Sequence, residues 1–273
     1  MLSFLTLPSL LPMSDTTPLL GRDDPAVFDV ERPEGTSPFL LIADHAGRHI
    51  PRQLGQLGLT PADLQRHIAW DIGIAGLAGQ MAARMDACLI RQNYSRLVID
   101  CNRPLLARDS IAALSENTAI PGNQNLTPSE GSVRAHAIFH PYHNRIRQEL
   151  LARKQAGRVT ILISLHSFTP VYQGVNRLWH AGVLYHRDTR LALPLLDLLR
   201  REPGLVIGDN EPYAVSDASD YSIPVHGERN GLPHVELEIR QDLISTAAGQ
   251  RAWADRLIRL LPLAAEIALS QNA

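Results

Sequence analysis

The chain has 273 residues, of which 45% are hydrophobic and 20% charged, with a formal net charge of −2 at pH 7. This length can bury a sizeable core, and the composition is ordinary for a globular protein. The nearly neutral charge and the lack of a basic run argue against a nucleic-acid partner. No apolar run is long enough to span a bilayer, so we expect no membrane partner.

The chain contains two cysteines, Cys88 and Cys101. They do not form a Cys-x-x-Cys pair, which excludes a zinc–thiolate site. One disulfide between them is an alternative, but the pattern favours two buried free thiols in a reducing compartment, so we expect a cytoplasmic protein. Residues 1–11 are apolar without a basic start and contain Pro8, which does not fit a signal peptide. Met13 is a second candidate start, and we expect disorder over about residues 1–20.

The first half of the chain alternates apolar runs with polar turns. The run at residues 39–43 predicts a buried strand, and Thr60-Pro61-Ala62-Asp63 is typical of a helix start. In chain order we predict a loop over residues 14–36, a strand over 39–43, a helix over 61–85 that carries Asp71 in its middle, strands over 87–91 and 96–100, and an irregular loop over 107–125.

The second half is organised around the run Ile161-Leu162-Ile163-Ser164-Leu165, which predicts a strand in the middle of a sheet. Thr127 and Glu130 form a capping-box pattern that opens a helix. We predict helices over residues 127–155, 188–200 and 246–269, strands over 159–165, 181–185, 206–208 and 234–239, and a polar loop over 209–231. Strands that alternate with helices predict an α/β fold with a mainly parallel sheet covered on both faces, in one domain.

Two histidines follow predicted strands, His45 after residues 39–43 and His166 after residues 159–165. Open α/β sheets bind ligands at this edge, and two neutral imidazoles there could hold zinc, although a buried structural histidine is a common alternative. A catalytic zinc site needs a third protein ligand. The candidates for that ligand are Asp44, His49 and Asp71, and the spacing alone does not choose among them.

Glu236 and Glu238 alternate with apolar residues, so they point to the same face of a strand. They are either solvated on a wet face, or one of them is a general base for metal-activated water. Asn102 and Arg103 follow another predicted strand. A guanidinium there could bind a substrate carboxylate as a planar fork, or it could make an ordinary surface ion pair.

A rival metal site is the pair His136 and His140, whose i,i+4 spacing on a helix could hold an ion. Pro141 interrupts that helix, and the segment lacks the His-Glu-x-x-His pattern of zinc proteases. The sequence has no Gly-x-Ser-x-Gly elbow, no Gly-x-Gly-x-x-Gly and no P-loop, so it indicates neither serine catalysis nor a nucleotide cofactor.

Four segments in this order resemble the N-formylglutamate amidohydrolase family, over about residues 39–243. They are Asp44-His45-Ala46-Gly47-Arg48, Val98-Ile99-Asp100-Cys101-Asn102-Arg103, Leu165-His166-Ser167-Phe168 and Glu238-Ile239-Arg240-Gln241-Asp242. The family is similar in fold to the zinc carboxypeptidases. The resemblance therefore implies a three-layer αβα sandwich with a mainly parallel mixed sheet.

The resemblance also implies zinc held by His45 and His166, with Glu238 as the general base. Asn102 and Arg103 would grip a substrate carboxylate. Arg48 stands where the carboxypeptidase pattern has a glutamate ligand, and we choose Asp71 as the third ligand.

The implied reaction is metal-dependent cleavage of the amide of a small acylated amino acid, such as N-formylglutamate to formate and glutamate, in amino-acid catabolism. We expect the loops over 104–126 and 209–231 to shape specificity, with Tyr213, Tyr221 and His226 as candidate contacts. The alternatives are a metallo-carboxypeptidase of short peptides and a non-catalytic protein of the same fold that binds a metal or ligand.

Overall fold

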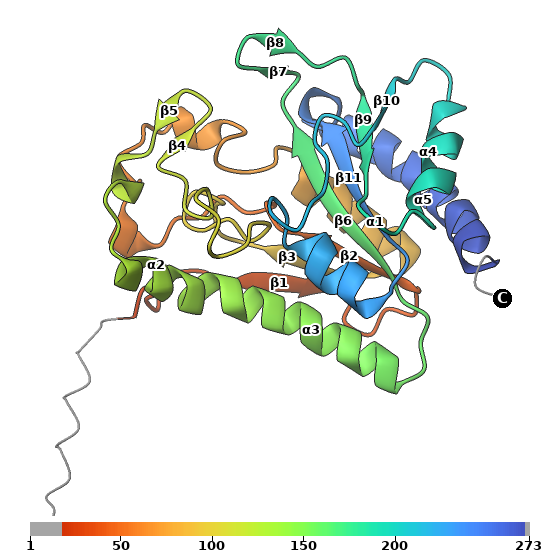
Figure 1. Cartoon of the computed structure of the whole chain (residues 1–273), viewed down its shortest axis with the longest axis horizontal. Helices are drawn as coiled ribbons and strands as arrows, with labels where there is room; N and C mark the ends of the chain where they lie inside the picture. Colours follow the sequence, from red (N-terminus) through yellow and green to blue (C-terminus); the bar gives the residue numbers. More distant parts are fainter. Residues whose placement is uncertain (1–17, 271–273) are drawn as a thin grey trace, which may run out of the picture.

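The computed structural model describes residues 18–270 and contains a mixed sheet of seven strands. The strands are β1 (Phe28–Glu31), β2 (Phe39–Ala43), β3 (Cys88–Gln92), β6 (Ile161–Phe168), β9 (Ala181–Leu184), β10 (Ile207–Asp209) and β11 (His234–Arg240). Their order is β1-β3-β2-β6-β11-β9-β10 (Figure 1). The four strands β3, β2, β6 and β11 run parallel, β1 and β9 are antiparallel to their neighbours β3 and β11, and β10 is parallel to β9. The strand predicted to be central, β6, is the middle strand.

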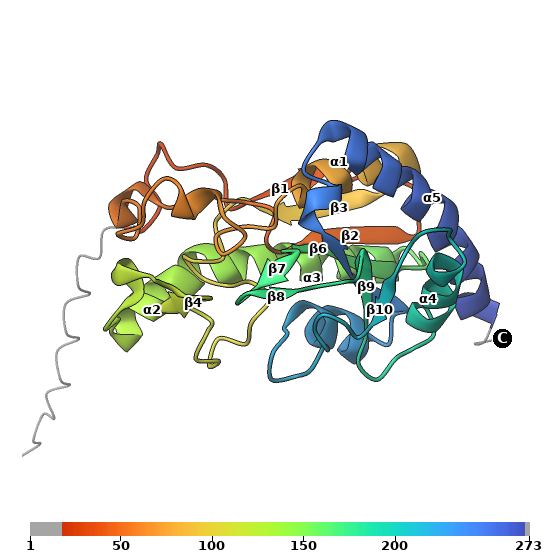
Figure 2. The same cartoon turned by 90° about the horizontal axis from the view of Figure 1, so that it is seen from above.

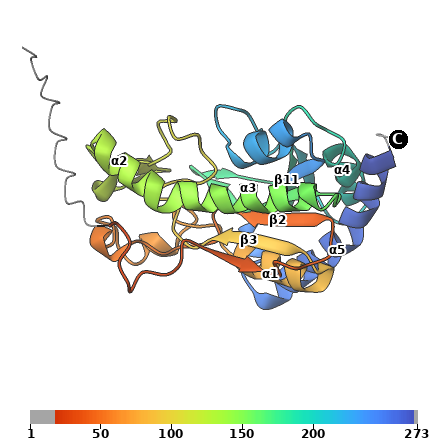
Figure 3. The same ribbon diagram turned by 90° about the horizontal axis from the view of Figure 1, so that it is seen from below.

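Helices cover both faces of the sheet (Figure 3). One face packs against α1 (Ile74–Met85), α4 (Ala192–Arg200) and α5 (Ala247–Ser270), and the other against the helical stretch made of α2 (Pro128–Arg134), a π-helical segment (Ala135–Phe139) and α3 (His140–Gln155). Every residue of β2 and β6 is buried. Continuous apolar runs of this kind are typical of parallel strands covered on both faces. The predicted three-layer αβα fold with a mainly parallel mixed sheet is confirmed.

The helix predicted over residues 127–155 is confirmed, including its start. The Thr127 hydroxyl accepts a hydrogen bond from the Glu130 backbone N–H, and the Glu130 carboxylate accepts one from the Thr127 N–H. Pro141 does not end this helix, because it lies in the first turn of α3, directly after the π-helical segment.

The helix predicted over residues 61–85 is wrong in its first half. The Thr60 hydroxyl accepts a hydrogen bond from the Asp63 N–H, but only a short 3₁₀ turn (Asp63–Gln65) follows, and α1 begins at Ile74. Tertiary hydrogen bonds hold the intervening chain in turns: the Ser95 hydroxyl donates to the Ala69 carbonyl, and the Asp71 N–H donates to the His45 carbonyl. Asp71 therefore lies in a turn before α1 rather than inside a helix.

Two further predictions differ from the structure. Residues 96–100 form turns rather than a strand, since the Val98 N–H bonds to the Ser95 carbonyl and the Asp100 N–H to the Ser110 carbonyl. The loop predicted over residues 14–36 contains β1. This segment forms a strand because it pairs with β3, and it lies at the edge of the sheet.

Smaller elements lie in the segments that connect the main strands and helices. They are the hairpins β4 (Leu114–Ser115) with β5 (Thr118–Ala119) and β7 (Val171–Tyr172) with β8 (Val175–Asn176), the 3₁₀ turns Arg52–Leu54, Pro121–Asn123, Glu228–Asn230 and Gln241–Leu243, and a π-helical segment Ile223–Gly227. Figures 1 and 2 show the β4–β5 hairpin on the side of the molecule away from α4, and the β7–β8 hairpin between the two.

Most of the segment expected to be disordered, about residues 1–20, lies outside the described residues; of its described part, Leu19 is buried. Among residues 18–270, no helix has the length and apolar character needed to cross a membrane.

Candidate active site

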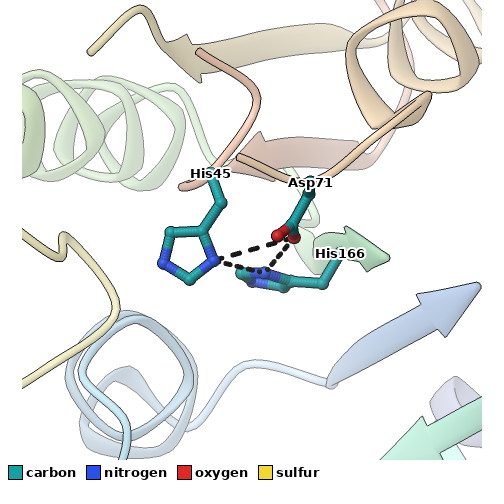
Figure 4. A group of neighbouring side chains, drawn as sticks. All are labelled: His45, Asp71 and His166. Carbon is teal, nitrogen blue, oxygen red and sulfur yellow. Dashed lines mark hydrogen bonds and ion pairs between the residues drawn. The ribbon is translucent and has the colours of Figure 1, made fainter. Parts of the chain in front are cut away.

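Three side chains from separate segments meet at the carboxyl edge of the sheet (Figure 4). His45 follows β2, His166 lies inside β6, and Asp71 lies in the turn before α1. The two histidine Nδ1 atoms are 3.1 Å apart, and Asp71 Oδ2 lies 3.1 Å from Nδ1 of His166 and 3.6 Å from Nδ1 of His45. All three residues are buried. The structure thus brings together the three residues predicted to hold a metal.

The outer nitrogen of each histidine ring faces an acceptor. His45 Nε2 lies 2.7 Å from Asp100 Oδ1, and His166 Nε2 lies 3.5 Å from Asp44 Oδ2 and 3.1 Å from the Ser164 hydroxyl. These acceptors can satisfy a hydrogen on Nε2 of each ring, and in that tautomer the lone pair of each Nδ1 faces inward and is free to bind a metal.

Two inward lone pairs 3.1 Å apart repel unless a cation or a proton lies between them. Burial disfavours a charged imidazole, but the carboxylates of Glu236, Asp44 and Asp71 outweigh it and raise the pKa of His166 well above its ordinary value. Two imidazole nitrogens and one carboxylate oxygen also match the ligand set of a catalytic zinc site. The cluster is therefore suited to a divalent cation.

The other two candidates for the third ligand lie elsewhere. Asp44 sits on the far side of the His166 ring, where its Oδ1 accepts a hydrogen bond of 2.7 Å from the Tyr142 hydroxyl. His49 is exposed, and its ring packs against Tyr94. Neither reaches the inner nitrogens of the two histidines.

The turn that carries Asp71 depends on a glycine. Asp71 Oδ2 accepts a hydrogen bond of 3.1 Å from the Ser167 N–H, which ties the turn to β6. Gly73 follows with φ of 85°, and a Cβ there would lie 2.2 Å from the Ile244 carbonyl oxygen. A larger residue would strain the backbone and displace the turn.

Glu236 and Glu238 reach the same cavity because β11 runs parallel to β6, with Glu238 opposite His166 and Glu236 opposite Ser164. Their exposed fractions are 4% and 7%, so the alternative that this face is wet is wrong. Burial raises the pKa of each carboxyl to about 8, although the positive charge of His166 opposes the shift.

The two carboxylates have different partners. Glu236 Oε2 accepts a hydrogen bond of 3.2 Å from Asn102 Nδ2. Glu238 Oε2 is buried and has no hydrogen-bond partner among residues 18–270. An unpartnered buried carboxylate is costly to keep in a fold, which makes Glu238 the better candidate for a functional role.

Asn102 and Arg103 also line the cavity, but the protein already engages them. The side-chain oxygen Oδ1 of Asn102 accepts hydrogen bonds from the backbone N–H groups of Tyr221 and Ser222. The Asn102 side chain therefore links its own segment to the 209–231 loop. Arg103 donates to Asp109 at 3.0 Å and to the Ser219 carbonyl. Its second terminal nitrogen, Nη2, has no acceptor within the described chain. Their substrate-binding role stays a prediction.

Sequence reasoning missed two residues of the site, Asp100 behind His45 and Arg96 beside it, and it considered Asp44 only as a metal ligand. Arg96 contacts Asp100 Oδ2 through Nε at 3.1 Å and Nη2 at 2.6 Å, and its Nη1 lies 3.8 Å from Asp71 Oδ1. The sequence predicts a strand over residues 96–100. A strand there gives no reason to expect the side chains of Arg96 and Asp100 beside the histidines. The sequence signal that could have found them is that both residues shortly precede Asn102 and Arg103 in the chain.

The rival pair His136 and His140 does not form such a cluster. The rings are 5.2 Å apart, but His136 is exposed and its Nδ1 lies 2.8 Å from the Ser132 carbonyl oxygen. Within residues 18–270, the one group of three possible metal ligands is His45, Asp71 and His166.

The site opens into a cavity of about 390 Å³. Its outer wall includes His67, Leu114, Glu116, Phe168, Tyr172 and Tyr213. Of the loop residues expected to contact a substrate, Tyr213 lines this cavity. Tyr221 and His226 do not line it, and pack instead around His143.

Comparison with known proteins gives a family and a fold. The family model for N-formylglutamate amidohydrolase matches residues 37–245. The chain is similar to the gene product Atu2144 from Agrobacterium tumefaciens, with 34% identity, a TM-score of 0.88, and coverage of 91% of this chain and 98% of that chain. It is similar in fold to N-formylglutamate amidohydrolase from Ralstonia eutropha JMP134, with 20% identity, a TM-score of 0.65, and coverage of 90% and 99%. A search of curated proteins found no match.

Proposed function

The chain belongs to the N-formylglutamate amidohydrolase family, and from this premise we propose that it uses zinc to hydrolyse the amide of a small N-acylated amino acid, such as N-formylglutamate. Membership of this family implies amidohydrolase activity. The proposal adds the metal, the acyl group and the amino acid.

One observation carries the proposal. Nδ1 of His45, Nδ1 of His166 and Oδ2 of Asp71 converge within 4.8 Å of one another in a cavity that also contains the unpartnered carboxylate oxygen of Glu238. Three ligands leave a fourth zinc position for water or substrate. When bound, zinc would polarise the amide carbonyl and lower the pKa of water.

The residues of the chain supply the proton transfer and the orientation. Glu238 takes a proton from the attacking water and passes it to the leaving amine, a role suited to a carboxyl whose pKa burial has raised toward neutrality. Arg96 places a positive charge beside the cluster, where negative charge develops on the carbonyl oxygen. Arg103 anchors the α-carboxylate through its free Nη2, so that binding energy away from the reacting carbon orients the amide.

We expect Asp100→Asn to weaken zinc binding about 10–100-fold, because Asp100 accepts the hydrogen bond that turns the Nδ1 lone pair of His45 inward. Zinc affinity should be measured by competition with a chromophoric chelator. Asp109→Asn is a matched control, since Asp109 also pairs with an arginine of the cavity but is not bonded to a histidine. Equal zinc affinity of Asp100→Asn and the unaltered protein would contradict the assigned role of Asp100.

The proposed function is tested by formate release from N-formyl-L-glutamate, comparing zinc-loaded protein with protein stripped by a chelator. We expect release that is lost on stripping and restored by zinc. Release that survives complete removal of metal would refute a metal-dependent mechanism. Cleavage of short peptides in place of formylated amino acids would favour a carboxypeptidase. A bound metal without turnover on either substrate panel would favour a non-catalytic binding protein.

We also propose that the protein works in the cytoplasm. The support is chemical: Cys88 and Cys101 are both buried free thiols. Burial raises the pKa of the Cys88 thiol to about 11 and that of Cys101 well above its ordinary value, so both stay protonated and unreactive.

A further inference from the structure

Arg177 is held among three aromatic rings at the wall of the cavity. It directly follows β8, and its guanidinium carbon lies 4.6 Å from the ring centre of Tyr172, 4.8 Å from that of Tyr213 and 5.8 Å from that of Phe168. Its Nη1 donates a hydrogen bond of 2.8 Å to the Tyr213 hydroxyl. All three rings line the cavity; Arg177 is not itself a lining residue, and the rings hold its guanidinium next to the cavity.

This guanidinium differs from the other two of the site in its lack of an acidic partner. Arg96 pairs with Asp100 at 2.6 Å, and Arg103 pairs with Asp109 at 3.0 Å. For Arg177, no carboxylate oxygen among residues 18–270 lies within 4.0 Å. Aromatic faces attract a cation without neutralising it, so the positive charge of Arg177 stays available to a ligand.

An acid on this wall, Glu116, is already neutralised. Glu116, at the turn of the β4–β5 hairpin, accepts hydrogen bonds from Arg66 Nη2 at 2.8 Å and from the Gln173 N–H at 3.1 Å. Glu116 thereby joins the two hairpins, and its pairing with Arg66 leaves the charge of Arg177 without an ion-pair partner among residues 18–270.

The Tyr213 hydroxyl adds a second donor. It accepts from Arg177, and its own hydrogen has no acceptor within the described residues. Burial and the Glu238 carboxylate raise the pKa of Tyr213, while Arg177 opposes that shift, so the phenol stays neutral and able to donate. A rigid guanidinium beside a phenol O–H is a suitable receptor for a carboxylate.

We propose that Arg177 and Tyr213 select the charge of the substrate by binding an anionic group on the side chain of its amino acid. This inference rests on the proposed function and assigns separate arginines to the two carboxylates of an acidic substrate: Arg103 to the α-carboxylate and Arg177 to the side chain. An amino acid with a neutral side chain would leave Arg177 without a partner and bind less tightly.

The test compares N-formyl-L-glutamate with N-formyl-L-glutamine, which has nearly the same shape but no side-chain charge. We expect the zinc-loaded enzyme to prefer the glutamate substrate in kcat/KM, and Arg177→Gln to lower that preference about 10–100-fold, mainly through KM. Arg177→Lys should keep part of the preference, because it keeps the charge. Tyr213→Phe should lower it less than Arg177→Gln.

The ratio of the two substrates separates recognition from folding, since a merely structural loss lowers both activities alike. Arg201→Gln, at an exposed arginine after α4, controls for the change in net charge. An unchanged preference in Arg177→Gln would overturn the inference.

Equilibrium binding separates this inference from the proposed function. Binding of both formylated compounds should be measured calorimetrically in the Glu238→Gln background, with and without Arg177→Gln. Selective loss of glutamate-substrate affinity supports the inference even if the unaltered enzyme does not release formate. Equal affinities for the two compounds with Arg177 present would overturn the inference, whatever the turnover.

Discussion

Glu238→Gln should lower kcat by at least about 100-fold while the protein keeps its zinc, because glutamine has the shape of glutamate but cannot take a proton from water. The change is well tolerated by the surroundings, since Glu238 Oε2 has no hydrogen-bond partner among the described residues that an amide would lose. Formate release measures the turnover, and elemental analysis of the purified variant measures the zinc.

Glu236→Gln is the matched control, two positions earlier on the same face of β11. Glu236 lies on the Nε2 side of the His166 ring, at 3.8 Å, and is bonded to Asn102. We expect a smaller loss of kcat from this variant. Full activity of Glu238→Gln would refute its role as base, and a greater loss in Glu236→Gln would assign that role to the neighbouring carboxylate.

Asp71→Asn should weaken zinc binding strongly. The loss should exceed the factor of about 10–100 that is typical when a residue that contacts a metal ligand, rather than the metal itself, is changed. An amide is a far poorer zinc ligand than a carboxylate, and Asp71 supplies the only negative charge among the three ligand side chains. Activity should fall in parallel and return partly at high zinc concentration. Zinc affinity and formate release at several zinc concentrations measure both effects.

Asp44→Asn is the comparison that decides the third ligand. Asp44 is as buried as Asp71 and also faces His166, but from the side of Nε2. We expect Asp44→Asn to keep much tighter zinc binding than Asp71→Asn. The reverse order would contradict the ligand set. Thermal unfolding of both variants shows whether either has lost the fold rather than the metal.

The sequence predicted the parts of the site that depend on single strands. His45 and His166 each follow or end an apolar run, and parallel strands bring their carboxyl ends to one edge, so their meeting follows from local patterns. The shared face of Glu236 and Glu238 follows equally from the two-residue period of a strand.

The remaining parts depend on contacts between distant segments. Asp71 was assigned to a helix because its neighbours suit one, yet hydrogen bonds to His45 and Ser167 keep it in a turn. The segment over residues 96–100 has a strand-like composition, but its backbone hydrogen bonds go to Ser95 and Ser110 rather than to a strand. Arg177 had no sequence signal, because its aromatic cage draws rings from β6, β7 and the distant 209–231 loop.

β11 completes both the sheet and the proposed site. This strand is made after β6 and β9, yet it inserts between them and carries Glu238. A chain that ends at β10 contains all three proposed metal ligands, but it lacks the strand between β6 and β9 and the proposed base. Under the proposed function, the strand that closes the sheet is therefore also the one that completes the site, because it brings Glu238 opposite His166.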